Sequence, residues 1–200
     1  QPAWSPDGSK IAFVDQSLQG VEGVIYVMNS DGTNLVNVSN NAANEIYPAW
    51  SPDGTKIAFR TDRDGNDEIY VMNADGSGQS NLSNNQADES LISGAWSPDG
   101  SKIAFSSRRD GRVQTYVMNA NGSNQVNLSN SSVDDGEAAW SPDGAKIVFA
   151  SGNPSFGGGY AHLTVMNADG SSRTNLTGGH DGLPQESQPS WQPVFQSIAV

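Results

Sequence analysis

The 200-residue sequence contains no cysteine, only two histidines and no long apolar run. Without cysteine there is no disulfide framework, no thiolate nucleophile and no cysteine-ligated zinc site. The longest apolar runs have only the length of a β-strand, so the sequence predicts no membrane-spanning segment and no signal-peptide core.

Basic residues are scarce. Ten Lys and Arg residues stand against 22 Asp and Glu residues, which gives a net charge of −12. Nucleic acids and anionic membrane surfaces are held largely by positive charge, so this balance disfavours both as partners. We therefore expect no nucleic-acid partner and no direct membrane insertion.

The rare residues recur with one period. The five Trp residues are separated by 46, 46, 44 and 51 positions, and the four Met residues follow the same rhythm. All four Lys residues stand six positions after a Trp. Self-similarity at a fixed period of this length is the sequence signature of a repeat architecture. The residues concerned are Trp4, Trp50, Trp96, Trp140, Trp191, Met28, Met72, Met118, Met166, Lys10, Lys56, Lys102 and Lys146.

Each repeat contains four short β-prone runs separated by turn residues. In the second repeat these runs are 47–50, 56–59, 68–73 and 79–83. Pro-Asp-Gly separates the first run from the second, and Ala-Asp-Gly the third from the fourth; both sequences suit tight turns. Four strands per unit of 44–51 residues is typical of a β-propeller blade.

The sequence thus predicts an all-β fold, a β-propeller of four-stranded antiparallel blades with four full repeats and a partial fifth. The whole chain, 1–200, forms one propeller domain in this interpretation. Its blades are expected at about 2–44, 45–90, 91–133 and 134–185, with a partial closing blade at 186–200.

The repeat resembles a known family. Trp-Ser-Pro-Asp-Gly-x-Lys-Ile-Ala/Val-Phe, followed by Tyr-Val-Met-Asn-Ala-Asp-Gly, is similar to the WD-like propeller repeat of TolB proteins over essentially the whole chain. The repeat serves periplasmic protein-binding propellers, peptidase-associated propellers and some sugar lyases, so the resemblance is specific for fold and weak for function. It implies a location in the periplasm or outside the cell.

Four blades and a remnant are fewer than a closed ring usually has. Three arrangements are open. The chain is the end of a longer propeller, or its C-terminal strand joins the N-terminal blade in a small ring, or its open edges pair with neighbouring chains. The first and third are favoured over self-closure.

Loops of variable length are expected on one face of the propeller. The Pro-Asp-Gly and Asn-x-Asp/Asn-Gly turns, which vary little, share one face. The loops between the second and third strands share the other face. Their length varies: the Phe of the second strand and the Tyr or Thr of the third are 13, 11, 11 and 15 residues apart in the four repeats. Binding residues concentrate on variable loops held by a rigid scaffold. The variable-loop face is therefore the expected binding surface.

Carboxylates are candidates for the mouth of the channel. Five positions before a Trp stand Glu45, Leu91, Asp135 and Glu186, on the innermost strand of each repeat. In the third repeat Asp88 and Glu89 are displaced from this position by two extra residues. Three carboxylates at this position would suit Ca²⁺, which is bound by oxygen ligands. The alternative is that they are solvated acids around a wide channel mouth. No other cofactor is expected.

Arginines are candidates for recognition of a protein partner. Arg63, Arg108 and Arg109 belong to a group of five Arg residues in the expected variable loops of repeats two and three, near several acidic residues. A mixed-charge patch can steer a protein partner, although solvated loop charges are equally compatible with the pattern.

Catalysis finds little support. His162 and His180 both fall in the fourth repeat, and no Gly-x-Ser-x-Gly elbow occurs. TolB-like lyases are understood to use several histidines around the channel. The leading hypothesis is therefore a non-enzymatic scaffold that binds proteins or associates with itself. The alternative is a propeller that binds a cation or small ligand in its channel, or the regulatory propeller of a larger hydrolase.

Overall fold

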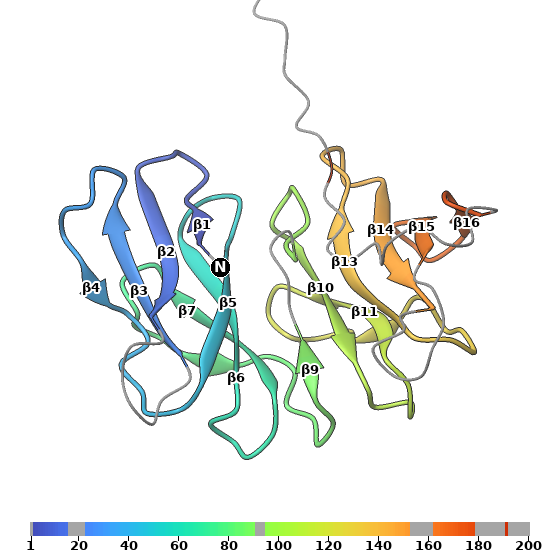
Figure 1. Cartoon of the computed structure of the whole chain (residues 1–200), viewed down its shortest axis with the longest axis horizontal. Coiled ribbons are helices and arrows are strands. Elements are labelled where there is room, and N and C mark those ends of the chain that lie inside the picture. Colours follow the sequence, from blue (N-terminus) through green and yellow to red (C-terminus); the bar gives the residue numbers. More distant parts are fainter. Residues whose placement is uncertain (1, 16–22, 91–94, 153–161, 179–190, 192–200) are drawn as a thin grey trace, which may run out of the picture.

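The chain folds into antiparallel β-strands. The computed structural model describes residues 2–15, 23–90, 95–152, 162–178 and 191, and these residues form sixteen strands and no helix (Figure 1). None of the described residues therefore forms a helix long and apolar enough to cross a membrane.

The strands form four four-stranded sheets, one from each complete repeat, which we call blades 1 to 4. The prediction of an all-β fold of four-stranded antiparallel blades is confirmed. Blade 1 contains β1 (Ala3–Trp4), β2 (Lys10–Asp15), β3 (Val24–Asn29) and β4 (Val36–Asn37). Blade 2 contains β5 (Glu45–Trp50), β6 (Lys56–Thr61), β7 (Glu68–Asn73) and β8 (Ser80–Asn81). Blade 3 contains β9 (Glu89–Ser90), β10 (Lys102–Ser107), β11 (Gln114–Asn119) and β12 (Val126–Asn127). Blade 4 contains β13 (Asp135–Trp140), β14 (Lys146–Ser151), β15 (His162–Asn167) and β16 (Thr174–Asn175).

The Ser-Pro-Asp-Gly sequence forms the first turn of every blade by the same contacts. In blade 2 the Ser51 hydroxyl donates to Asp53 Oδ1 at 2.6 Å and accepts from the Lys56 amide at 2.9 Å. Gly54 has φ +70°, a left-handed conformation that glycine adopts without steric cost. The turn is thus fixed by its own side chains, and its repetition sets the register between the first and second strand of each blade.

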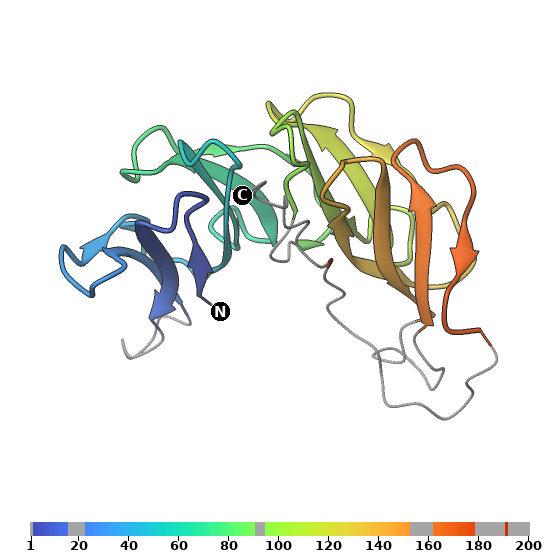
Figure 2. The same cartoon turned by 90° about the horizontal axis from the view of Figure 1, so that it is seen from above.

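The blades stand side by side in an arc (Figure 2). The first strands, such as β1, lie toward the inside of the arc, and the fourth strands, such as β4 and β16, lie toward its outside. The described loops between the second and third strands, those of blades 2 and 3, lie at one end of the blades, the lower end in Figure 1, and the Pro-Asp-Gly turns lie at the other. This separation of the two kinds of loop agrees with the sequence interpretation.

The hydrophobic core lies between the blades. Because side chains alternate along a strand, each blade has two apolar faces. The face with the Trp, Ile, Phe, Tyr and Met of the repeat, which we call the leading face, packs against the preceding blade. The opposite trailing face carries smaller residues. In the contact between blades 1 and 2, the leading face of blade 2 buries Trp50, Ile57, Phe59, Tyr70 and Met72 against Ala12, Ile25, Val27 and Val38 of blade 1.

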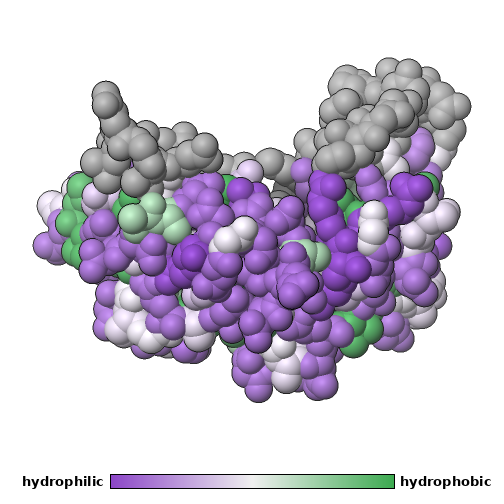
Figure 3. Space-filling view, turned by 90° about the horizontal axis from the view of Figure 1, so that it is seen from below, coloured by the Kyte–Doolittle hydropathy of each residue, from purple (hydrophilic) through white to green (hydrophobic). Residues whose placement is uncertain are grey.

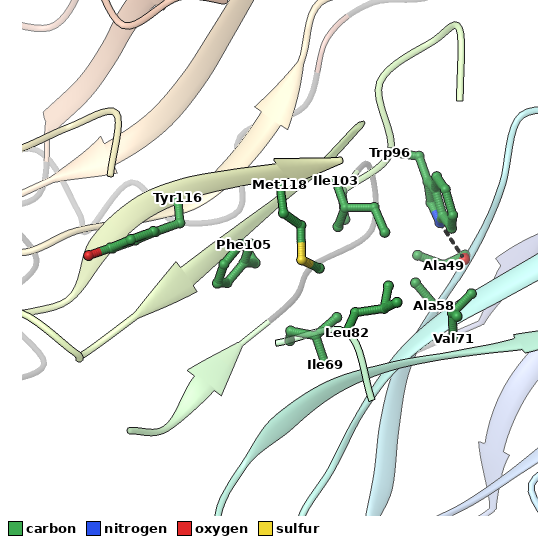
Figure 4. Close-up of a cluster of buried hydrophobic side chains, with 11 residues drawn as sticks. Ala49, Ala58, Ile69, Val71, Leu82, Trp96, Ile103, Phe105, Tyr116 and Met118 are labelled. Atoms are coloured by element: carbon green, nitrogen blue, oxygen red, sulfur yellow. Dashed lines mark hydrogen bonds between the residues drawn. The ribbon is translucent and has the colours of Figure 1, made fainter. Parts of the chain in front are cut away.

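Figure 4 shows the same contact between blades 2 and 3, where Ile103, Phe105 and Met118 meet Ile69 and Leu82. The Trp indole completes it: Trp96 Nε1 donates to the Ala49 carbonyl of the preceding blade at 3.1 Å. Trp50 and Trp140 make the equivalent bonds to Ala3 and Ala95. The same Trp hydrogen bond therefore recurs at each of the three contacts between blades 1 to 4.

The tryptophan of the partial fifth repeat continues this series. Trp191 Nε1 donates to the Ala139 carbonyl of blade 4 at 3.2 Å. Trp191 thus occupies on blade 4 the position that Trp140 occupies on blade 3. The remainder of the predicted closing blade, including Glu186, lies outside the described residues.

Candidate functional site

The variable-loop face is the end of the molecule that the sequence predicts to bind a partner. Figure 3 views the molecule from this side and shows a surface dominated by polar and charged residues. Arg63, Arg108 and Arg109 follow β6 and β10 at this end, and Glu45 and Asp135 begin β5 and β13 there.

Glu45 does not line a solvated mouth. Its side chain is 0% exposed and forms an ion pair with Arg63, which folds back from the loop after β6. Arg63 Nη1 also donates to Gln79 Oε1 at 2.7 Å, and Gln79 Nε2 donates to the Ser39 carbonyl of blade 1 at 2.8 Å. The guanidinium lies over the Tyr70 ring, 4.6 Å from its centroid. This Glu–Arg–Gln chain connects the inner strand of blade 2 to blade 1.

Blade 3 repeats the arrangement with Glu89. Arg109 Nη2 lies 2.9 Å from Glu89 Oε1, and Arg109 Nη1 donates to Gln125 Oε1 at 2.6 Å. Gln125 Nε2 in turn donates a hydrogen bond to the Leu82 carbonyl of blade 2 at 3.0 Å. In the strand pairing Glu89 lies opposite Ser107, as Glu45 lies opposite Thr61. The carboxylate position is thus filled in blade 3 by Glu89, although it stands seven residues before Trp96. Leu91, the residue at the predicted offset, lies outside the described residues.

Blade 4 holds its carboxylate with an arginine from another strand. Arg173 binds both oxygens of Asp135, at 2.8 and 2.9 Å, and donates to Ser151 Oγ at 2.7 Å. Arg173 precedes β16 at the position of Gln79 and Gln125, seven residues after the repeat Met. The sequence interpretation missed Arg173 because it counted loop arginines; counting from the Met would have found it.

These contacts separate the predicted site residues into two groups. Glu45, Asp135, Arg63 and Arg109 are joined in ion pairs within their own blades, whereas Glu186 lies outside the described residues. Among the described residues, no group of three or more His, Asp or Glu side chains is placed to hold a metal ion. Arg108 is exposed and belongs to a different feature, a cleft on the same face.

The cleft lies at the variable-loop ends of blades 2, 3 and 4 and has a volume of about 360 Å³. Four carboxylate side chains and two guanidinium groups are among the residues that line it. These are Asp67, Asp88, Glu89, Glu137, Arg60 and Arg108. Arg60 Nε lies 3.3 Å from Asp67 Oδ1 within the cleft. The cleft brings together charges from three blades that no single repeat motif predicts.

Glu89 is buried in the wall of this cleft, and its protonation is shifted accordingly. Burial raises the pKa of Glu89 to about 7, against the opposing effects of the Arg109 guanidinium and the Ser107 hydroxyl; nearby Glu68 raises it further. Its Oε1 accepts from Arg109 and Ser107, whereas its Oε2 has no hydrogen-bond partner among the described residues. Glu45 Oε2 is also without a partner there, but Glu45 is not among the residues that line the cleft.

We expect Glu89→Gln to remove a pH-dependent part of the free energy of unfolding. The folded-state pKa of about 7 lies above the ordinary 4.5, so the folded chain holds this proton more tightly than the unfolded chain. The resulting stabilisation is fully present below about pH 4.5 and is lost as the pH rises through about 7. Over this window the unmodified chain should lose on the order of 2 kcal/mol more than the variant, measured by urea unfolding at a series of pH values. Parallel pH curves for the two proteins would contradict this assignment.

His162 does not form part of a catalytic cluster in the described residues. It begins β15, is half-buried, and pairs across the sheet with Ser151. His180 lies outside the described residues.

Comparison with known proteins supports the fold and the family. The family model of the TolB β-propeller domain matches residues 1–195. A putative TolB from Agrobacterium tumefaciens superimposes with a TM-score of 0.77 at 27% identity, covering 88% of this chain and 63% of that chain. TolB from Acinetobacter baumannii has a TM-score of 0.71 at 24% identity, covering 88% of this chain and 42% of that chain. The chain thus spans less than two thirds of either protein.

The same fold occurs in an enzyme. A puromycin-hydrolyzing peptidase from Mycobacterium tuberculosis has a TM-score of 0.65 at 18% identity, covering 88% of this chain and 28% of that chain. At this identity the likeness concerns the fold alone. No curated protein matches the chain.

Proposed function

Because this chain belongs to the TolB β-propeller family, we propose that it is a non-enzymatic scaffold that binds proteins and assembles through its blade faces. We place it in the periplasm or outside the cell. Family membership and the absence of cysteine support this location. The proposed partner is a protein that presents a blade-like apolar face, and a second copy of this chain presents one.

One observation carries this proposal: the leading face of blade 1 is exposed, whereas the same face of blades 2 to 4 is buried. Trp4 is 60% exposed, while Trp50, Trp96 and Trp140 are 7–8% exposed. Ile11, Phe13 and Met28 are only half-buried and line an open apolar pocket with Pro2 and Val14. Figure 3 shows apolar surface at the end of the molecule that blade 1 forms. Contiguous apolar patches of this kind mark interaction surfaces.

The trailing face of blade 4 is contacted by Trp191 at the Ala139 carbonyl, and elsewhere it exposes apolar side chains that could form the complementary surface. Its Leu176 is 56% exposed, whereas Val38 and Leu82 at the equivalent positions of blades 1 and 2 are 4% and 7% exposed. Leu163 and Val165 on the same face are half-buried. A chain that carries both halves of a blade-to-blade contact can associate head to tail with another copy, in a heterologous contact.

Sedimentation velocity over about 10 to 500 µM protein tests this proposal. We expect the unmodified chain to sediment faster as its concentration rises, and Trp4→Glu to remain a monomer, because a buried unpaired charge opposes the contact. Val126→Glu is the matched control: Val126 is 51% exposed on β12, away from the leading face of blade 1. This control should associate as the unmodified chain does. Equal association of the Trp4 variant and the unmodified chain would overturn the proposal.

A further inference from the structure

Each described junction between two blades has one site for a Trp indole, which we call the indole site of the preceding blade. It consists of the backbone carbonyl of the residue before that blade's own Trp, together with the surface around it. The Trp–carbonyl pairs are Trp50–Ala3, Trp96–Ala49 and Trp140–Ala95, at 3.1–3.2 Å. These three indoles are 7–8% exposed. Because a packed interface leaves no space for a second ring, each indole site holds one Trp.

The indole site of blade 4 is occupied by a residue of the same chain. Trp191 Nε1 donates to the carbonyl of Ala139, the residue directly before Trp140, at 3.2 Å. Trp191 is only half-buried, whereas the indoles in the other three sites are buried. The Trp191 indole therefore has less apolar surface removed from water than they have, and it is held more weakly.

Trp4 is the repeat Trp for which no indole site is described. It is 60% exposed, and the Trp-Ser-Pro-Asp-Gly motif that begins with it is identical to that of Trp50. In a head-to-tail contact built like the other junctions, Trp4 of a second copy donates to the Ala139 carbonyl. This is the carbonyl that Trp191 already uses. The two indoles therefore cannot occupy the indole site of blade 4 together.

The fifth repeat keeps the Trp and departs from the motif that follows it. In blades 1 to 4 the Ser after the Trp donates to the Asp of the first turn at 2.6 Å. After Trp191 the sequence continues with Gln192, Pro193 and Val194. The Ser and the Asp that fix the first turn of the other blades are thus missing from this repeat. The group that fills an indole site is retained.

We propose that Trp191 caps the indole site of blade 4 and competes for it with Trp4 of a second copy. This inference rests on the proposed head-to-tail assembly and names what regulates it. The cap belongs to the same chain as its site, so its effective concentration is fixed, whereas that of a second copy rises with the protein concentration. Assembly therefore requires that a second copy displace a half-buried indole.

Trp191→Ala tests the cap through the direction of its effect on association. Without the indole the Ala139 carbonyl is free for Trp4 of a second copy. The dissociation constant from sedimentation velocity should therefore fall at least about tenfold relative to the unmodified chain. Trp191→Phe keeps an aromatic ring and loses the N–H, so it should lower the dissociation constant by a smaller factor. Circular dichroism and thermal unfolding of both variants establish that the blades are folded.

A double variant shows whether the gained association passes through the proposed contact. Trp4→Glu combined with Trp191→Ala leaves the indole site of blade 4 open and places a charge where the second copy's indole would enter. Burying an unpaired charge is unfavourable, so the double variant should remain a monomer. Association of the double variant as strong as that of Trp191→Ala would refute the competition between the two indoles.

The cap and the assembly fail in different ways. If Trp191→Ala associates more weakly than the unmodified chain, Trp191 belongs to the assembly surface and is not a cap. Equal association of the two proteins also refutes the cap. In both cases a loss of association on Trp4→Glu in the otherwise unmodified chain leaves the head-to-tail assembly standing. If neither the unmodified chain nor Trp191→Ala associates, the cap and the assembly role are both wrong.

Discussion

Phe105→Ala should lower the free energy of unfolding by about 3–5 kcal/mol, which makes it one of the most destabilising single substitutions in the chain. Phe105 is 2% exposed and lies in the core between blades 2 and 3, in contact with the trailing face of blade 2. Removing its ring leaves a cavity between two sheets whose strands are held in register by their turns. The sheets therefore cannot collapse freely to fill the space. Urea unfolding monitored by tryptophan fluorescence measures the change.

Phe13→Ala is the matched control for this prediction. Phe13 occupies the same repeat position in blade 1, where no preceding blade is described, and it is only half-buried. The same truncation should cost about 1 kcal/mol there, because less apolar surface leaves the protein interior. Similar losses for the two variants would contradict the assignment of the main core to the contacts between blades.

The contrast between these two phenylalanines also shows how far the sequence predicts the fold. The period of Trp, Met and Lys predicts the blades because these residues recur at the same strand positions in every complete repeat. Trp96, for example, must be large to cover the preceding blade and must carry an N–H to reach the Ala49 carbonyl. The exposure of Trp4 does not follow from its motif, which is identical to that of Trp50. It depends on which blade stands in front of it.

The candidate site was harder to predict because it depends on contacts between segments far apart in the sequence. Counting back from Trp aligns Glu45 and Asp135 but leaves Glu89 two residues out of line, whereas the strand pairing places Glu89 at the same position. Arg63 and Arg173 reach Glu45 and Asp135 from different loops, so these two acids form ion pairs that the spacing from Trp does not reveal. The cleft beside Glu89 combines side chains of blades 2, 3 and 4, which no repeat unit contains alone.

Arg173→Gln should lower the free energy of unfolding by about 3 kcal/mol. Gln is the residue at the equivalent position of blades 2 and 3, where Gln125 donates to the Leu82 carbonyl, so it fits the local backbone. The Asp135 side chain is 0% exposed and would lose both guanidinium bonds, keeping only the 2.6 Å bond from Ser131 Oγ. A buried carboxylate whose charge partner is removed destabilises the folded state strongly.

A double-mutant cycle separates this pair from an ordinary surface ion pair. Asp135→Asn combined with Arg173→Gln removes both charges, so the double variant should be more stable than the sum of the single losses predicts, by about 2 kcal/mol. The comparison is Arg60→Gln, whose partner Asp67 has a side chain 27% exposed; its loss should stay below about 1 kcal/mol. Chemical denaturation of the unmodified chain and the four variants at about pH 7 and low salt provides the measurement. If Arg173→Gln costs no more than Arg60→Gln, then the Asp135–Arg173 pair does not hold β13 and β16 of blade 4 together.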